Sequence, residues 1–191
     1  MHLRRKSELQ LSNIKPDDNI TEILKTDLSK GFRLIVEKYS SKLYWHIRRL
    51  VIIHEDADDV LQNTFFNAWR SMGDFRNESS LYTWLYTIAT NESLTLINKR
   101  KKNSAVSIDD LGSYFANSLE GSSWFDGDEA QIKLQNAILQ LPEKQRIVFN
   151  LKYFDEMTYE QMSKITRTSE GALKASYHHA VKKIEKILTG D

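Results

Sequence analysis

The sequence contains no cysteine, and this absence excludes several kinds of protein. It leaves no disulfide framework, no thiolate metal site and no cysteine nucleophile. Only 2 prolines and 7 glycines occur among 191 residues, which argues against a turn-rich all-β fold and favours helices. No apolar run approaches the roughly 18 residues of a membrane-spanning helix. The basic N-terminus at 1–6 is not followed by an apolar stretch, so we predict no signal peptide and expect a cytoplasmic protein.

The formal net charge of +1 is near zero because segments of opposite charge offset one another. Residues 1–102 hold 17 basic and 13 acidic residues and 131–191 hold 10 and 7, whereas 103–130 hold six acidic residues and no basic one. The acidic segment is also rich in Ser and Gly, which predicts a linker over 103–128. Four aromatic residues interrupt it: Tyr114, Phe115, Trp124 and Phe125. They favour docking either on a partner or back on the chain's own domain, and both interpretations stay open.

Apolar residues at steps of three and four predict three main helices in the first basic segment. The first covers 29–51, and a shorter helix precedes it around 19–26. The second begins near Glu55, whose carboxylate suits the positive end of the helix dipole. The third begins after the serine pair at 79–80, where either serine is a good N-cap, and it ends in the basic run at 99–102.

The outward face of the second helix carries four residues that a solvated face would not normally combine: Asp59, Gln62, Asn63 and Phe66. Phe66 is a large apolar group at a position where a charge would be expected. Two interpretations stay open. The face is either a second, wetter core contact or a partner surface on which polar groups surround an aromatic anchor.

The loop at 73–80 carries residues that can stack on a base, pair with a phosphate and hydrogen-bond a base edge: Phe75, Arg76 and Asn77. Three aromatic residues follow the loop: Tyr82, Trp84 and Tyr86. Together with the basic run at 99–102 they form the mixture of aromatic and basic groups that single-stranded nucleic acid binding requires. Trp84 lies on the apolar stripe of its helix, so we expect it in the core.

Four further helices are predicted over 129–188. Pro142 separates the first two and is well placed as the first residue of the second. Thr158 and Gln161 form a capping box, so a short third helix begins there. A turn at 166–168 then leads into the last and longest helix.

A short helix, a three-residue turn and a longer helix make a helix-turn-helix, in which the start of the second helix enters the major groove of DNA. The outward residues of that helix are Glu170, Gly171, Lys174, Ala175 and His178. Lys182 lies further along and suits a phosphate. A plain helical bundle with a solvated lysine face is the alternative.

Several segments, in one order, resemble those of bacterial sigma factors. Residues 56–65 resemble the core-polymerase-binding motif of region 2, and 75–91 resemble the promoter-melting segment that follows it. The segments at 141–146, 153–154 and 158–160 resemble the opening of region 4, and the likeness continues along the recognition helix. From the order of these segments and the lack of further regions, the chain is identified as a member of the extracytoplasmic-function (ECF) subfamily.

The resemblance implies an all-α protein of two small helical domains joined by an acidic linker. Region 2 covers 17–102, the linker 103–128 and region 4 covers 129–188. In the family, region 2 docks on the clamp helices of the beta-prime subunit and opens the −10 promoter element. Region 4 reads the −35 element near the beta-subunit flap. The implied partners are core RNA polymerase, promoter DNA and an anti-sigma factor, with no cofactor and no metal.

The resemblance also assigns residues to three sites. The core-polymerase site comprises Asp59, Gln62, Asn63 and Phe66. The −10 site comprises Phe75, Arg76, Asn77, Asn91, Lys99 and Arg100. The −35 site comprises Glu170, Gly171, Lys174, Ala175, His178 and Lys182. One departure concerns the turn at 166–168, which reads Thr-Arg-Thr where the family commonly has Leu-Gly-Ile, so a residue other than glycine would take a strained left-handed conformation.

Two other classes of protein are less compatible with the sequence. A helix-turn-helix activator with an N-terminal sensing domain would explain 129–191 but not the surface around Phe66, and it would bind duplex DNA without polymerase. An enzyme would need a convergent site. Adjacent residues on a helix point about 100° apart, so neither the carboxylates at 55–59 nor the pair His178–His179 converges on one point. The paired histidines of a zinc helix are four residues apart and lie on one face. We therefore predict a protein that is not an enzyme. The isolated His46 and His54 are expected at the surface.

Overall fold

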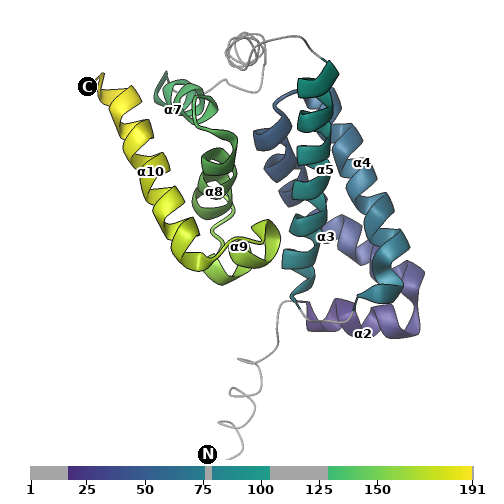
Figure 1. The fold of residues 1–191 in the computed structure, drawn as a ribbon. Coiled ribbons are helices and arrows are strands. Elements are labelled where there is room, and N and C mark those ends of the chain that lie inside the picture. The colour runs from purple at the N-terminus through teal and green to yellow at the C-terminus, as the bar shows by residue number, and fades with distance from the viewer. Residues whose placement is uncertain (1–16, 76–78, 104–128, 191) are drawn as a thin grey trace, which may run out of the picture.

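The structure is a computed structural model that describes residues 17–75, 79–103 and 129–190 (Figure 1). Within these residues every regular element is a helix, as predicted. The elements are α2 (Asp18–Thr26), α3 (Leu28–Val51), α4 (His54–Ser71), the 3₁₀ helix η1 (Met72–Asp74), α5 (Leu81–Asn103), α7 (Glu129–Leu139), α8 (Glu143–Tyr153), α9 (Tyr159–Thr166) and α10 (Glu170–Thr189). Apart from Asn103, the predicted linker lies outside the described residues.

Capping residues account for where several helices begin. The hydroxyl of Ser80 accepts a hydrogen bond from the backbone N–H of Thr83 at 3.1 Å, so Ser80 rather than its neighbour caps α5. Thr158 and Gln161 form the predicted capping box before α9. Pro142 is the N-cap of α8 and not its first helical residue, because its ψ of 142° is extended.

The first three long helices, α3, α4 and α5, pack into a bundle, and α2 lies across α3 at one end (Figure 1). Fully buried residues on the predicted stripes meet inside it: Ile35, Leu43, Ile47, Ala57, Ala68, Leu85 and Ala89. Full burial of one large aliphatic side chain contributes about 1.5–3 kcal/mol. The hydrophobic effect along these stripes therefore accounts for the bundle.

The C-terminal helices form a second unit in which α10 packs against α7, α8 and α9. Its own core consists of Ala137, Ile138, Leu141, Phe149, Ala180 and Ile184. Between α9 and α10, Arg167 adopts a left-handed conformation with a φ of 53°, the conformation that the sequence predicted for a non-glycine residue in this turn. The helix-turn-helix is thus formed by α9 and α10.

The two units pack directly against each other, a placement that the sequence left open. Helix α9 lies beside the first half of α5, and α8 contacts α3 (Figure 1). Leu151, Met157 and Met162 of the second unit belong to the same buried cluster as the core of the first. His46, expected at the surface, is completely buried on α3 at this interface, so that expectation was wrong.

The crossing of α2 and α3 depends on a glycine. A Cβ atom at Gly31 would lie 2.7 Å from Leu24 Cδ2 and 2.9 Å from the Leu24 Cα, so the backbone of α2 would have to move. We expect Gly31→Ala to destabilise the protein by about 1–3 kcal/mol, the usual cost of overpacking. Urea denaturation would measure this loss. Gly73→Ala is the matched control, because a Cβ there meets nothing within 4 Å. Equal midpoints for the two variants would contradict the tight crossing.

Candidate functional site

An exposed aromatic and polar face runs along α4. All four residues predicted to bind core polymerase are exposed: Asp59, Gln62, Asn63 and Phe66. Their spacing of three and four places them on one side of the helix. Phe66 is 59% exposed, and the guanidinium carbon of Arg70 lies 5.6 Å from its ring centre. This exposure rules out the alternative of a second core contact.

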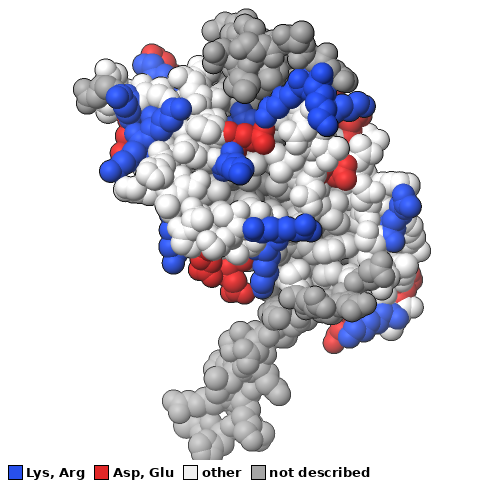
Figure 2. All heavy atoms as spheres, viewed as in Figure 1, with Lys and Arg blue, Asp and Glu red and all other residues white. Residues whose placement is uncertain are grey.

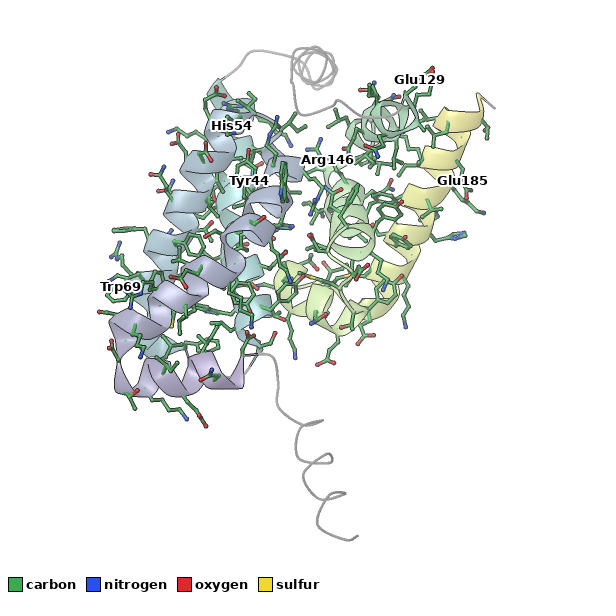
Figure 3. All side chains as sticks on the ribbon, turned by 180° about the vertical axis from the view of Figure 1, so that it is seen from behind. Tyr44, His54, Trp69, Glu129, Arg146 and Glu185 are labelled. Carbon is green, nitrogen blue, oxygen red and sulfur yellow. The ribbon has the colours of Figure 1, made fainter. Side chains whose placement is uncertain are left out.

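Trp69 adds to this surface. It is 39% exposed, stands edge-on to Phe32 with ring centres 5.0 Å apart, and lies at the outer edge of the molecule (Figure 3). Thr64 is buried on the same helix and donates its hydroxyl to the carbonyl of Val60 at 2.7 Å. A polar residue whose hydroxyl is satisfied within its own helix can be buried, which a hydrophobic pattern does not reveal.

A polar hollow of about 400 Å³ lies between the end of α4 and the middle of α5. Its lining residues are Asn67, Arg70, Ser71, Ile88, Asn91 and Glu92. The amide of Asn67 donates to the carboxylate of Glu92 at 2.9 Å, and Asn91 is exposed beside them. Amide and guanidinium groups are the side chains that hydrogen-bond base edges and phosphates. The hollow can therefore accommodate part of a nucleotide.

The structure places the other residues assigned to the −10 site in different surroundings. Phe75 is half-buried and packs on Trp84, with ring centres 4.9 Å apart. Trp84 in turn packs against the core of the bundle, as predicted. Arg76 and Asn77 lie outside the described residues. Asn91 follows Trp84 after two helical turns and therefore lies on the same face of α5. Phe75 lies beside that face as well, because it packs on Trp84.

Two basic residues near the end of α5 differ in their surroundings. Lys99 is exposed, whereas Arg100 forms a two-point ion pair with Asp56 at the start of α4, with distances of 2.5 and 2.6 Å. Burial raises the pKa of the Asp56 carboxyl, and the positive charge of Arg100 offsets part of that rise. Figure 2 shows Lys and Arg side chains gathered over this end of α5. Of the two, Lys99 is available to a phosphate.

The tyrosines of α5 do not form the exposed nucleic-acid surface that the sequence suggested. Tyr86 is only 2% exposed, and Tyr82 is half-buried beside it with ring centres 4.3 Å apart. Burial raises the pKa of the Tyr86 hydroxyl far above its usual range, so the group is neutral. Both rings lie on the side of α5 that the second unit covers, and local periodicity does not show such a cover.

The recognition helix α10 presents the six residues assigned to the −35 site, all of which are exposed: Glu170, Gly171, Lys174, Ala175, His178 and Lys182. Ser169 caps the helix by accepting the backbone N–H of Ala172 at 3.4 Å. The ammonium of Lys174 lies 4.0 Å from the Glu170 carboxylate and 5.5 Å from the ring centre of Tyr159. Lys and Arg side chains also gather along the later turns of α10 (Figure 2).

Family models match both halves of the chain. Residues 35–103 match Sigma-70 region 2, and residues 131–184 match Sigma-70, region 4. The first match contains the face of α4 and the hollow, and the second contains the helix-turn-helix.

Curated relatives extend this likeness over most of the sequence. The chain is 30% identical over 180 residues to the RNA polymerase sigma-H factor of Pseudomonas aeruginosa, which covers 90% of this chain and 93% of the relative. It is 29% identical over 183 residues to the ECF RNA polymerase sigma factor SigW of Bacillus subtilis, covering 88% and 94%. The chain therefore belongs to the bacterial sigma factors and, within them, to the ECF subfamily. It is a transcription initiation factor that binds core RNA polymerase and directs it to promoters by opening the −10 element and recognising the −35 element.

Solved structures show the same fold. CnrH in complex with the cytosolic domain of CnrY aligns with a TM-score of 0.69 at 20% identity, over 93% of this chain and 99% of that one. The sigma factor RpoE in complex with the anti-sigma factor NepR from Bartonella quintana aligns with a TM-score of 0.67 at 22% identity, over 85% and 99%. In the described part of this chain, no helix combines the length and apolarity needed to cross a membrane.

Proposed function

We propose that three separate surfaces divide the work of this sigma factor. The exposed face of α4 binds core polymerase at the beta-prime clamp helices, the hollow between α4 and α5 binds the −10 element, and the first turns of α10 read the −35 element near the beta flap. The observation that carries the proposal is Phe66, a large aromatic side chain that is 59% exposed amid polar groups on α4. Anchors of protein interfaces have this character.

The polymerase surface is tested by removing its centre. Phe66→Ala together with Gln62→Ala should weaken binding to core polymerase roughly 30-fold, since truncating interface anchors costs about 2 kcal/mol. Both side chains are exposed, so the free energy of unfolding should stay within about 0.5 kcal/mol of the parent. Fluorescence anisotropy with purified core enzyme would measure the affinity. Glu37→Ala with Lys42→Ala, two exposed residues on α3, is the control. Unchanged affinity in the α4 variant would refute the assignment.

For the −10 element, we propose that a base unstacked from the non-template strand enters the hollow beside Asn91. The hollow holds amide, guanidinium and carboxylate groups, and aromatic Phe75 and Trp84 lie nearby along α5. Unstacking a base costs a few kcal/mol, which contacts in such a pocket offset. Lys99 would hold the adjoining backbone. Arg76, Asn77 and Arg100 remain proposed contributors, although Arg100 would first have to leave Asp56.

Open-complex formation tests this pocket. Asn91→Ala should leave core binding intact and reduce the permanganate reactivity of promoter thymines, because the flipped base loses a hydrogen-bonding partner. Asn98→Ala is the control, since Asn98 is also exposed and lies two turns further along α5. If both variants open the promoter to the same extent as the parent, the pocket assignment is withdrawn.

For the −35 element, we propose that Lys174 and His178 reach base edges. They are one turn apart near the start of α10, which is the part of a recognition helix that enters the major groove. Lys182 lies about 12 Å from Lys174 along the helix axis at 1.5 Å per residue, where the helix has left the base edges. It therefore contacts backbone phosphate. Glu170, Gly171 and Ala175 complete the surface, and a Cβ atom added at Gly171 would meet nothing within 4 Å, which leaves room for DNA.

Two lysine variants separate base reading from phosphate binding. Lys174→Ala should cost about 1–3 kcal/mol on the preferred −35 sequence and reduce discrimination among sequences. Lys182→Ala should weaken binding to all sequences alike and lower the salt slope by about one. Holoenzyme binding to a set of −35 variants at several salt concentrations would measure both. A reversed outcome, with Lys182→Ala changing the preferred sequence, would mean that α10 docks in a different register.

The same proposal includes the domain limits, the cellular location and a further partner of the protein. We propose domain limits of 17–102 for region 2, 103–128 for the linker and 129–188 for region 4. The protein would act in the cytoplasm without a cofactor and without catalysis of its own, since the polymerase supplies the chemistry. An anti-sigma factor is a further proposed partner, because the RpoE structure of the same fold contains one.

A further inference from the structure

The hollow between α4 and α5 contains a carboxylate that binding to a DNA backbone does not explain. Three residues from the end of α4 and three from the middle of α5 line it, each set at spacings of three and four, and the two helices pack side by side (Figure 1). One of them, Glu92, carries a negative charge. Because phosphates repel a carboxylate, Glu92 lowers the affinity of the hollow for the backbone of DNA. Its charge suits the edge of a base instead.

A contact across the two helices holds Glu92 in a defined orientation. The side-chain amide of Asn67 on α4 donates to Glu92 Oε1 at 2.9 Å. An ionised carboxylate can only accept, so the Asn67 atom that faces it is the amide nitrogen. Asn67 is half-buried, and its backbone carbonyl accepts the hydroxyl of Ser71 at 2.8 Å one turn further along α4. The carboxylate is thus anchored through one of its two oxygens.

The other oxygen, Oε2 of Glu92, is available to a ligand in the hollow. Among residues 17–75, 79–103 and 129–190, Asn67 is the one hydrogen-bond partner of the Glu92 side chain, and no cation pairs with it. The guanidinium carbon of Arg70, which lines the same hollow, lies 5.6 Å from the ring centre of Phe66. Glu92 is half-buried, and a hydrogen bond formed away from bulk water is stronger than one at a fully solvated surface.

The pairing edges of the four bases differ in what they present to such an oxygen. Cytosine, adenine and guanine each carry an exocyclic amino group, which donates a hydrogen bond. Thymine carries carbonyl oxygens at both exocyclic positions of its pairing edge, and a carboxylate oxygen repels them. Cytosine is the closest match to the hollow. Its amino group suits Glu92, while its ring nitrogen and its carbonyl can accept from Arg70 and Asn91.

We propose that Glu92 sets the base preference of the hollow: it admits an unstacked base with an exocyclic amino group, cytosine above all, and rejects thymine. Asn67 is the positioning residue that keeps the carboxylate in place. This inference rests on the function proposed above for the hollow and adds the class of base that it takes. A carbonyl placed against the carboxylate leaves two acceptors without a donor, so thymine should bind about tenfold more weakly than cytosine.

Forked DNA locates the promoter position that the hollow reads. A promoter is selected from a random library with holoenzyme made from core polymerase and the full chain, and its −10 segment is then presented with the non-template strand unpaired. Each −10 base is replaced in turn by an abasic site. At one position the loss of binding should be large in the parent and small in Asn91→Ala. If no position behaves in this way, the hollow binds no base, and both the proposed function and this inference are overturned.

Base analogues at that position test the class of base. With the parent, a cytosine analogue that lacks only the amino group should bind about tenfold more weakly than cytosine, as thymine should. Glu92→Ala should abolish both differences. Glu92→Gln keeps an acceptor and adds an N–H donor, so thymine should bind nearly as well as cytosine. Fluorescence anisotropy of labelled forks would measure the affinities, and urea denaturation would show that each variant is folded.

The matched control is Glu37→Gln, which removes an exposed carboxylate from α3, outside the hollow. This variant should keep the preference for cytosine over thymine. Loss of a negative charge can raise the affinity for every fork, so the ratio between two bases is the decisive quantity. If the parent prefers thymine at the position identified with Asn91→Ala, or if Glu92→Ala and Glu92→Gln keep the parental ratio, this inference is overturned while the proposed function stands.

Discussion

Helix α3 makes two kinds of contact along its 24 residues, and the arrangement of the whole molecule depends on the difference between them. Its apolar stripe, with Ile35, Leu43 and Ile47 fully buried, meets α4 and α5. Apolar burial is non-directional and roughly proportional to area, so it holds the bundle together as a unit. Its last turns instead present His46 and Arg49 to the second unit. Those contacts are directional, and they depend on the single carboxylate of Asp155.

The two kinds of contact respond differently to displacement. A hydrogen bond to a carboxylate weakens steeply once the donor moves beyond its narrow range of distances and angles, and water then replaces the lost partner. Apolar contacts shared between the units, such as those of Leu151 and Met162, would be exposed when the units part. The contact of α3 with the turn after α8 is therefore defined in geometry, and the shared apolar cluster adds non-directional burial to it. Region 2 retains its own core in either case.

Much of the fold could be predicted from the sequence because its signals are local. The stripes of α3, α4 and α5, the cap at Ser80 and the capping box at Thr158 each lie within one helix or its first turn. The positions that sequence analysis misjudged depend on partners far along the chain. His46 and Tyr86 are buried because a turn more than 60 residues away covers them. The exposed residues of α4 could be identified from the sequence because Phe66 is a large apolar side chain on an otherwise polar face.

The ion pair between Asp56 and Arg100 has a mechanical consequence. It fastens the last turn of α5 to the first turn of α4 through a hydrogen bond from Arg100 to one Asp56 oxygen and an ion-pair contact with the other oxygen. A displacement of the end of α5 is consequently shared with α4, the helix that carries the exposed Phe66. The position of the last turn of α5 and the orientation of α4 are thereby mechanically linked.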